Sequence, residues 1–130
     1  MIVADASALL AVVLRIEGAD AIEAKLFGSG LMLHAPHVLD AEVAHVICRY
    51  AATGQIGPQR GRELLADLSD LPLYRHAHDW LLPRVWQLRH SLTCHDGLYV
   101  ALAEALDALL VPRDRRLAAA PGHHARVEVV

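Results

Sequence analysis

The sequence predicts an α/β fold of three layers, with a parallel β-sheet between two layers of helices. Short apolar segments of strand length alternate along the chain with longer segments of helical periodicity. This alternation is typical of strand–helix–strand units, in which the connecting helices cover both faces of a parallel sheet. With 130 residues, of which 55% are hydrophobic and 21% charged, the chain is expected to form one domain, residues 1–130.

The first half of the chain should contain two strands and three helices. Strands are expected at residues 2–5 and 31–34, which are short apolar segments that end in a polar residue. Helices are expected at 7–15 and 19–27, each followed within three residues by glycine. A third helix should begin at Pro36, because proline is favoured in the first turn of a helix, and should run to about residues 53–54.

The second half alternates in the same way and should contain three strands and three helices. Its last helix is apolar on most sides, so we expect this helix to lie deep in the core. The expected strands cover residues 71–74, 109–111 and 126–130. The expected helices cover residues 58–68, 79–89 and 93–106.

Charge and hydropathy limit the location and partners of the chain. The net charge of −3 does not indicate a nucleic-acid binder, although a basic rim around an acidic centre would not show in a net count. The apolar run at 6–14 is too short to span a bilayer, and residues 1–5 lack the basic segment of a signal peptide. The expected location is the cytoplasm, without membrane contact.

Two features of composition have ordinary explanations. Lys25 is the only lysine among 12 basic residues, and either phosphate binding by arginine or a compositional bias explains this. The two cysteines, Cys48 and Cys94, lie within expected helices. They should be small buried residues rather than disulfide partners.

Four carboxylates stand where the chain should change from one element to the next. Asp5 and Asp114 each follow an apolar strand, and Asp96 lies in the first turn of a long apolar helix. Glu42 lies beside the apolar stripe of the helix that should begin at Pro36. The carboxyl ends of parallel strands form the ligand-binding edge of an open α/β sheet. If the acids converge there, their oxygens suit Mg²⁺ or Mn²⁺ and hence phosphodiester chemistry.

Local structure offers a simpler role for each of these acids. Asp5 and Asp114 can cap the helices that follow them. Residues 93–96 nearly match a capping box, with the acid close to the positive end of a helix. Helix geometry does not choose between Glu42 and Asp40, which flank opposite sides of one apolar stripe. Capping and metal binding are compatible at the same residue.

Around these acids the chain resembles the PIN-domain ribonucleases, specifically the VapC-type toxins of toxin–antitoxin pairs. Each matching segment is short, but their order, their spacing and the total length of the chain together make the resemblance specific. The four segments are residues 2–10, 38–43, 92–103 and 109–118.

The resemblance implies a five-stranded parallel sheet of order 3-2-1-4-5 between helices, as one PIN domain over residues 1–130. It implies metal-dependent hydrolysis of RNA with Mg²⁺ or Mn²⁺. It also implies a VapB-type antitoxin as partner and a homodimer of the chain. It selects Glu42 rather than Asp40 as a site residue. The implied metal ligands are Asp5, Glu42, Asp96 and Asp114.

Neighbouring side chains are expected to support these acids or to contact the substrate. Ser7 and Thr93 match hydroxyl positions of the family and are expected to hydrogen-bond near the metal. Arg113, Arg115 and Arg116 surround the fourth acid and can contact flanking phosphates.

Two residues depart from the family pattern. Pro112 stands where Thr or Ser is frequent, and Gly97 replaces an alanine that commonly follows the third acid. Pro112 removes a hydroxyl from the surroundings of the metal. Asp114 is therefore the least secure of the four implied ligands.

Each alternative function requires residues that can be checked in the sequence. An inactive PIN-like module that binds RNA or protein would be expected to have lost at least one acid. A haloacid-dehalogenase-type site needs a second acid where Ser7 stands, and a response-regulator receiver needs a late lysine, whereas Lys25 is the only lysine. The nine histidines suggest zinc, but no C-x-x-C or H-E-x-x-H pattern accompanies them. They are expected to be solvated surface residues.

Two tryptophans, Trp80 and Trp86, lie in the helix expected at 79–89. They can pack in the core, or they can anchor a partner protein, because large rigid side chains contribute strongly to interfaces. The sequence alone leaves both explanations open.

Overall fold

Five parallel strands form the sheet at the centre of the molecule, and the structure, a computed structural model, describes residues 1–130. Their order across the sheet is 3-2-1-4-5, as the resemblance implies. The switch point of this winding lies between the first and fourth strands, where open α/β sheets bind ligands. The strands are β1 (Ile2–Ala4), β2 (Leu33–Pro36), β3 (Leu73–His76), β4 (Leu109–Val111) and β5 (Arg126–Val127).

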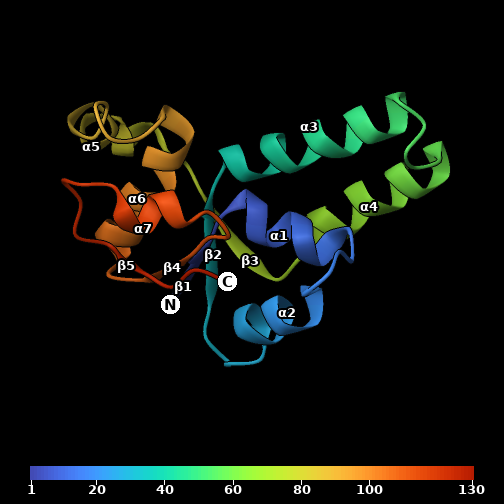
Figure 1. The fold of residues 1–130 in the computed structure, drawn as a ribbon, viewed down its shortest axis with the longest axis horizontal. Coiled ribbons are helices and arrows are strands. Elements are labelled where there is room, and N and C mark those ends of the chain that lie inside the picture. The colour runs from blue at the N-terminus through green and yellow to red at the C-terminus, as the bar shows by residue number, and fades with distance from the viewer.

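Seven α-helices and one 3₁₀ turn connect the strands. They are α1 (Ala6–Val13), α2 (Ala19–Phe27), α3 (Val38–Ala52), α4 (Pro58–Asp70), the 3₁₀ turn η1 (Asp79–Leu81), α5 (Leu82–Gln87), α6 (Cys94–Leu106) and α7 (Arg115–Ala119). Figure 1 shows α1 to α4 on one side of the strands and α5 to α7 on the other. The three-layer α/β fold is therefore confirmed. None of the helices combines the length and the apolar character that a membrane crossing requires.

The most deeply buried elements are β1 and α6. Every residue of β1 is at most 1% exposed, and residues 97–103 of α6 are all buried. The helix packs against both β1 and β2. A strand covered on both faces and a helix that is apolar on most sides are typical of a parallel sheet between helices. The expected deep burial of the segment at 93–106 is confirmed.

Pro36 ends β2 and does not begin α3, so that expectation is wrong. It pairs with His76 in the register of β2 and β3, and the next residue, His37, donates its N–H to the carbonyl of His76 (2.8 Å). Successive N–H groups of a strand point to opposite sides, so the nitrogen of Pro36 faces β1. There β1 pairs with β2 only at Leu33 and His34. The missing N–H therefore breaks no ladder hydrogen bond.

The segment expected as one helix at 79–89 consists of two parts. A 3₁₀ turn comes first, and α5 begins only at Leu82. Pro83 has no N–H to donate to the carbonyl of Asp79, so a regular α-helix does not continue through this point.

Several residues that could have been part of the core lie on the surface instead. Trp80 is 50% exposed and Trp86 is 66% exposed, so the core explanation is wrong for both. Cys48 and Cys94 are free and exposed, so the expectation of small buried residues is wrong as well. Both tryptophans are therefore available for contact with another molecule.

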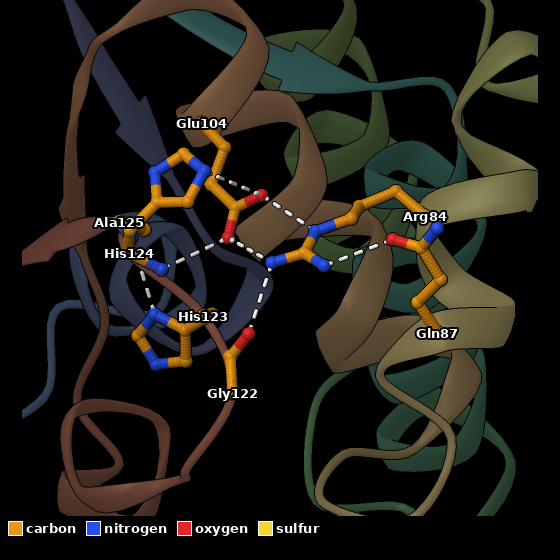
Figure 2. A network of polar contacts seen from close by, with 7 residues as sticks. All are labelled: Arg84, Gln87, Glu104, Gly122, His123, His124 and Ala125. Carbon is orange, nitrogen blue, oxygen red and sulfur yellow. Dashed lines mark hydrogen bonds and ion pairs between the residues drawn. The ribbon is translucent and has the colours of Figure 1, made fainter.

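A buried carboxylate joins α5, α6 and the chain before β5 (Figure 2). Arg84 donates from Nε and Nη2 to the two oxygens of Glu104, at 2.8 and 3.0 Å. The Glu104 side chain is 6% exposed and also accepts the backbone N–H of His124 (3.1 Å). Burial alone would raise the pKa of Glu104, but the hydrogen bonds from Arg84 and His124 outweigh it and hold that pKa below its usual value.

We expect Glu104→Gln to lower the free energy of unfolding by about 2 kcal/mol, because the glutamine keeps the shape but leaves Arg84 without a charged partner. Urea unfolding at pH 7 measures the loss. Asp107→Asn is the matched control, since Asp107 pairs with Arg126 at 3.5 Å but its side chain is 96% exposed. The control should change the free energy of unfolding little. Equal losses in both variants would contradict a stabilising role of the buried pair of Arg84 and Glu104.

Candidate active site

Asp5 lies at the carboxyl end of β1 and caps the N-terminus of α1. The residue is only 6% exposed. Its Oδ1 accepts the backbone N–H of Ala8 (3.0 Å) and the hydroxyl of Ser7 (2.7 Å). Its Oδ2 accepts no hydrogen bond from the protein. The cap therefore occupies one oxygen and leaves the other available to a ligand.

The environment of Asp5 raises its pKa to about 6. Burial is the largest cause, the hydrogen bonds from Ala8 and Ser7 oppose it, and the negative charges of Asp96 and Glu42 add to it. Loss of water disfavours the ionised carboxylate, and nearby like charges disfavour it further. The structure therefore brings Asp96 and Glu42 close enough to Asp5 for their charges to act on its carboxylate.

Glu42 reaches this group from α3. Its Oε1 accepts a hydrogen bond from the hydroxyl of Tyr99 on α6 (2.7 Å). Burial and the charge of Glu42 raise the pKa of Tyr99 above its usual value, so the phenol stays protonated and donates. Asp40 has a different partner, because its Oδ2 pairs with Arg75 of β3 at 2.7 Å. Tertiary contacts thus distinguish two acids that helix geometry could not.

No local sequence pattern identifies Tyr99 as a site residue. It stands in an apolar helix and is 2% exposed, as a core residue would be. The available signal is chemical, since a buried tyrosine usually needs a partner for its hydroxyl. That partner, Glu42, lies 57 residues away in the sequence, so only the packing of α3 against α6 shows it.

Asp96 lies in the first turn of α6, which Thr93 caps. Oγ1 of Thr93 accepts the backbone N–H of Asp96 (3.2 Å), so the threonine half of the expected capping box is confirmed. The reciprocal hydrogen bond to the Asp96 carboxylate is absent, and that carboxylate accepts none from elsewhere in the protein. Asp96 is therefore held at a positive helix end with its oxygens free.

Asp114 is held by its own loop rather than by the other acids. It caps α7 by accepting the N–H of Arg116 (2.9 Å), and the guanidinium of Arg116 donates to its Oδ2 (2.6 Å). These hydrogen bonds from Arg116 keep the pKa of Asp114 below its usual value. Capping and ion pairing are therefore observed at Asp114, and metal binding there stays a prediction.

The hydroxyl of Ser7 connects the two strand ends that carry Asp5 and Asp114. It donates to Oδ1 of Asp5 (2.7 Å) and accepts the backbone N–H of Arg113 (3.2 Å). One side chain therefore links the loops after β1 and β4 at the switch point of the sheet.

The donor set fits a hard divalent cation. Carboxylate oxygens are the ligands that Mg²⁺ and Mn²⁺ prefer, and the free oxygens belong to Asp5 and Asp96. A cation would also relieve the repulsion that contributes to the raised pKa of Asp5. No three His, Cys, Asp or Glu side chains lie close enough together to enclose an ion. Enclosing one therefore requires side-chain rotamers that differ from those of the present structure.

One histidine pair differs from the solvated residues that the sequence suggests. His34 is 8% exposed, its Nδ1 lies 2.9 Å from Nε2 of His76, and its ring stacks on Tyr74. Burial lowers the pKa of His34, and the charge of His76 lowers it further. Two imidazoles without a third metal-binding side chain nearby do not form a structural zinc site.

Known proteins resemble this chain in sequence and in structure. A sequence model of the PIN domain matches residues 2–122. Ribonuclease VapC1 of Mycobacterium tuberculosis is 42% identical over 115 residues, which are 88% of this chain and 86% of the relative. The crystal structure of VapBC2 from Rickettsia felis, bound to a promoter DNA fragment, has a TM-score of 0.71 at 13% identity and covers 100% of this chain and 99% of that one. The crystal structure of VapC20 from Mycobacterium tuberculosis has a TM-score of 0.72 at 14% identity, and the match covers 95% of this chain and 97% of that one. At such identities the structural likeness concerns the fold alone.

We expect Asp5→Asn to stabilise the metal-free chain by about 2–3 kcal/mol at pH 7. Asparagine keeps the oxygen that caps α1 but has no charge to bury. The folded-state pKa of about 6 lies above the ordinary value of 3.8, so the folded chain binds the proton more tightly than the unfolded chain does. Wild-type stability should therefore fall as the pH rises from about 4 to about 6. Melting curves in chelator at pH 4 and pH 7 measure the difference, which should be small at pH 4.

Two further melting experiments serve as controls for this prediction. Asp40→Asn should lower the melting temperature, because it removes the charge that pairs with Arg75. Mn²⁺ should raise the melting temperature of the wild type, since a ligand at 100 times its Kd stabilises the folded state by about 2.7 kcal/mol. If Asp5→Asn melts at a lower temperature in chelator and responds to Mn²⁺ as the wild type does, Asp5 has a structural role and the proposal of a metal centre is contradicted.

Proposed function

The chain belongs to the PIN-domain family, and from this premise we propose that it is an endoribonuclease that uses Mg²⁺ or Mn²⁺ to hydrolyse RNA. The observation that carries the proposal is the group formed by Asp5, Glu42 and Asp96 at the carboxyl end of β1, in which the charges of Glu42 and Asp96 add to the burial that raises the pKa of Asp5. No basic side chain forms an ion pair with these three. Unpaired acids at the switch point of an α/β sheet are suited to a divalent cation and a phosphodiester.

The acids have distinct tasks in this proposal. Asp5 and Asp96 hold the cation with their free oxygens, and Asp114 is the third direct ligand. Glu42, which Tyr99 aligns, binds the cation directly or through water, or orients the attacking water. When bound, the cation lowers the pKa of a water molecule and neutralises the charge that develops on the leaving oxygen.

Neighbouring residues position the acids and the substrate. Ser7 fixes the orientation of Asp5 through its hydrogen bond, and Thr93 fixes the first turn of α6. Arg113, Arg115 and Arg116 are exposed and contact the phosphates that flank the scissile bond.

Asp5→Asn and Asp96→Asn should each reduce RNA cleavage by roughly a hundredfold or more, because metal-ion stabilisation of the transition state is worth several kcal/mol. Cleavage of total cellular RNA in Mg²⁺ or Mn²⁺, with sequencing of the new ends, measures the loss. Asp40→Asn is the matched control and should cleave at nearly the wild-type rate below its melting temperature. Near wild-type cleavage by Asp5→Asn or Asp96→Asn would contradict the proposed metal centre.

The alternative is a catalytically inactive PIN-like module that binds RNA or protein. The presence of all four acids and the raised pKa of Asp5 favour catalysis, since a binding module has no need of a buried unpaired carboxylate. Purified wild-type chain that leaves RNA intact in both Mg²⁺ and Mn²⁺ would support the inactive module.

We further propose that the chain is a cytoplasmic toxin, that it forms a homodimer, and that its partner is a VapB-type antitoxin. The structurally similar Rickettsia felis complex contains both VapB and VapC components. In this chain the exposed Trp80 offers an aromatic anchor for a protein interface. An antitoxin arginine placed among Asp5, Glu42 and Asp96 would form charge-assisted hydrogen bonds and block the site.

Light scattering should show a dimer at tens of micromolar. Trp80→Ala should weaken the dimer about tenfold or more, as truncation of a central aromatic anchor does. The cognate antitoxin should abolish RNA cleavage by the wild type. A wild-type monomer at these concentrations would exclude the dimer, and unchanged cleavage with the antitoxin would exclude the inhibitory contact.

A further inference from the structure

Asp114 is the only one of the four predicted ligands whose carboxylate already has a positive partner. All four hydrogen bonds that this carboxylate accepts come from one residue, Arg116. Oδ1 accepts the backbone N–H (2.9 Å) and Nε (3.1 Å), and Oδ2 accepts Nε (2.9 Å) and Nη2 (2.6 Å). An ionised carboxylate offers about four lone-pair positions, two on each oxygen. Arg116 therefore occupies the positions that a metal ion would need.

The guanidinium of Arg116 has no partner other than this carboxylate. Its side chain is 90% exposed, and every hydrogen bond that the guanidinium donates goes to Asp114. A guanidinium and a carboxylate match each other in planar two-point contacts, so the geometry of the pair is specific. An exposed ion pair nevertheless contributes little free energy. Another cation can therefore replace the guanidinium at low cost.

The backbone around this pair is fixed by contacts that do not involve the guanidinium. Leu117, the next residue, is 1% exposed in the core. The backbone N–H of Arg113 donates to Oγ of Ser7 (3.2 Å). The backbone N–H of Arg116 caps α7 on Asp114 whether or not the guanidinium is in place. Displacement of the guanidinium is thus a side-chain movement that leaves the loop and α7 as they are.

Arg116 also lies close enough to the other acids to be influenced by their charge. The hydrogen bond to Asp114 and the charge of Asp114 raise the pKa of Arg116, and the charge of Asp96 raises it further. Arg113 and Arg115 are exposed as well, but no hydrogen bond or ion pair joins their side chains to an acid. Of the three arginines around the fourth acid, only Arg116 is therefore tied to the candidate metal centre.

We propose that Arg116 is an internal cation that closes the Asp114 position until a divalent metal ion displaces it. The inference rests on the proposed function and separates Arg116 from Arg113 and Arg115, whose side chains are free throughout. Asp114 has a positive partner both before and after the exchange. The released guanidinium lies beside the acids, where it can bind a phosphate oxygen. Metal and RNA phosphate then favour each other's binding, because each favours the open position of Arg116.

Calorimetric titration with Mn²⁺, in the absence of RNA, tests the displacement in three variants. Arg116→Gln removes the charge, and Arg116→Lys keeps the charge but loses the two-point contact. Arg115→Gln is the matched control, because it removes the same charge from the adjacent residue. Arg116→Gln should bind Mn²⁺ about fivefold more tightly than Arg115→Gln does, and Arg116→Lys about twofold more tightly than the wild type.

Nuclear magnetic resonance follows the guanidinium itself. The Nε–H signal of Arg116 is identified by its absence from the spectrum of Arg116→Lys. In chelator this proton should be protected from exchange with water, because both carboxylate oxygens accept it. Saturating Mg²⁺ should remove the protection. This readout depends on neither RNA cleavage nor metal affinity.

Three results would overturn the displacement and leave the metal centre in place. They are equal Mn²⁺ affinity of Arg116→Gln and Arg115→Gln, unchanged affinity of Arg116→Lys, and an Nε–H signal that stays protected in saturating Mg²⁺. Absence of Mn²⁺ binding by the wild type and by all three variants would overturn the metal centre and the displacement together. Cleavage of RNA by the wild type is measured separately, so failure of the proposed function is distinguishable from failure of this inference.

Discussion

The burial of one carboxylate, that of Asp5, is the constraint on which the rest of the site depends. β1 is covered on both faces by helices, so the residue that follows it is only 6% exposed. Its charge is tolerated because Ala8 and Ser7 donate to one oxygen, yet its pKa still rises to about 6. Ser7 then connects this strand end to the loop after β4 through Arg113. The hydrogen bonds that stabilise this one charge therefore also connect the loops after β1 and β4 at the switch point.

Acidic residues in this chain fall into two groups that differ in their partners. Glu104 and Asp40 lie within 3 Å of arginine nitrogens, in ion pairs that join separate elements of the fold. Asp5 has no basic partner, and the burial of its charge raises the free energy of the folded state. Such uncompensated acids are unusual in a structural role, because a paired or apolar residue would be more stable there. A cation bound by the folded chain and not by the unfolded chain would offset this cost.

Net charge alone would have excluded RNA as a partner, but the distribution of charge does not. Asp5, Glu42 and Asp96 lie together at the carboxyl end of β1, while residues 80–95 contain no acidic residue. Arginine and exposed indole lie side by side in that segment, at Trp86 and Arg89. An acidic site and a basic, aromatic segment are compatible in one small domain, because screening limits each field to about 8–10 Å.

The sequence by itself determined the alternation of strands and helices and the positions of the four acids, because periodicity and capping depend on residues only a few positions apart. The family resemblance added the strand order and the choice of Glu42. Only the tertiary structure decided that Glu42 meets Tyr99 and that Asp40 meets Arg75, over separations of 57 and 35 residues. It also decided that Pro36 ends a strand, since that depends on how far β1 extends beside it. These contacts depend on sheet register and helix packing, which bring together residues that no local pattern connects.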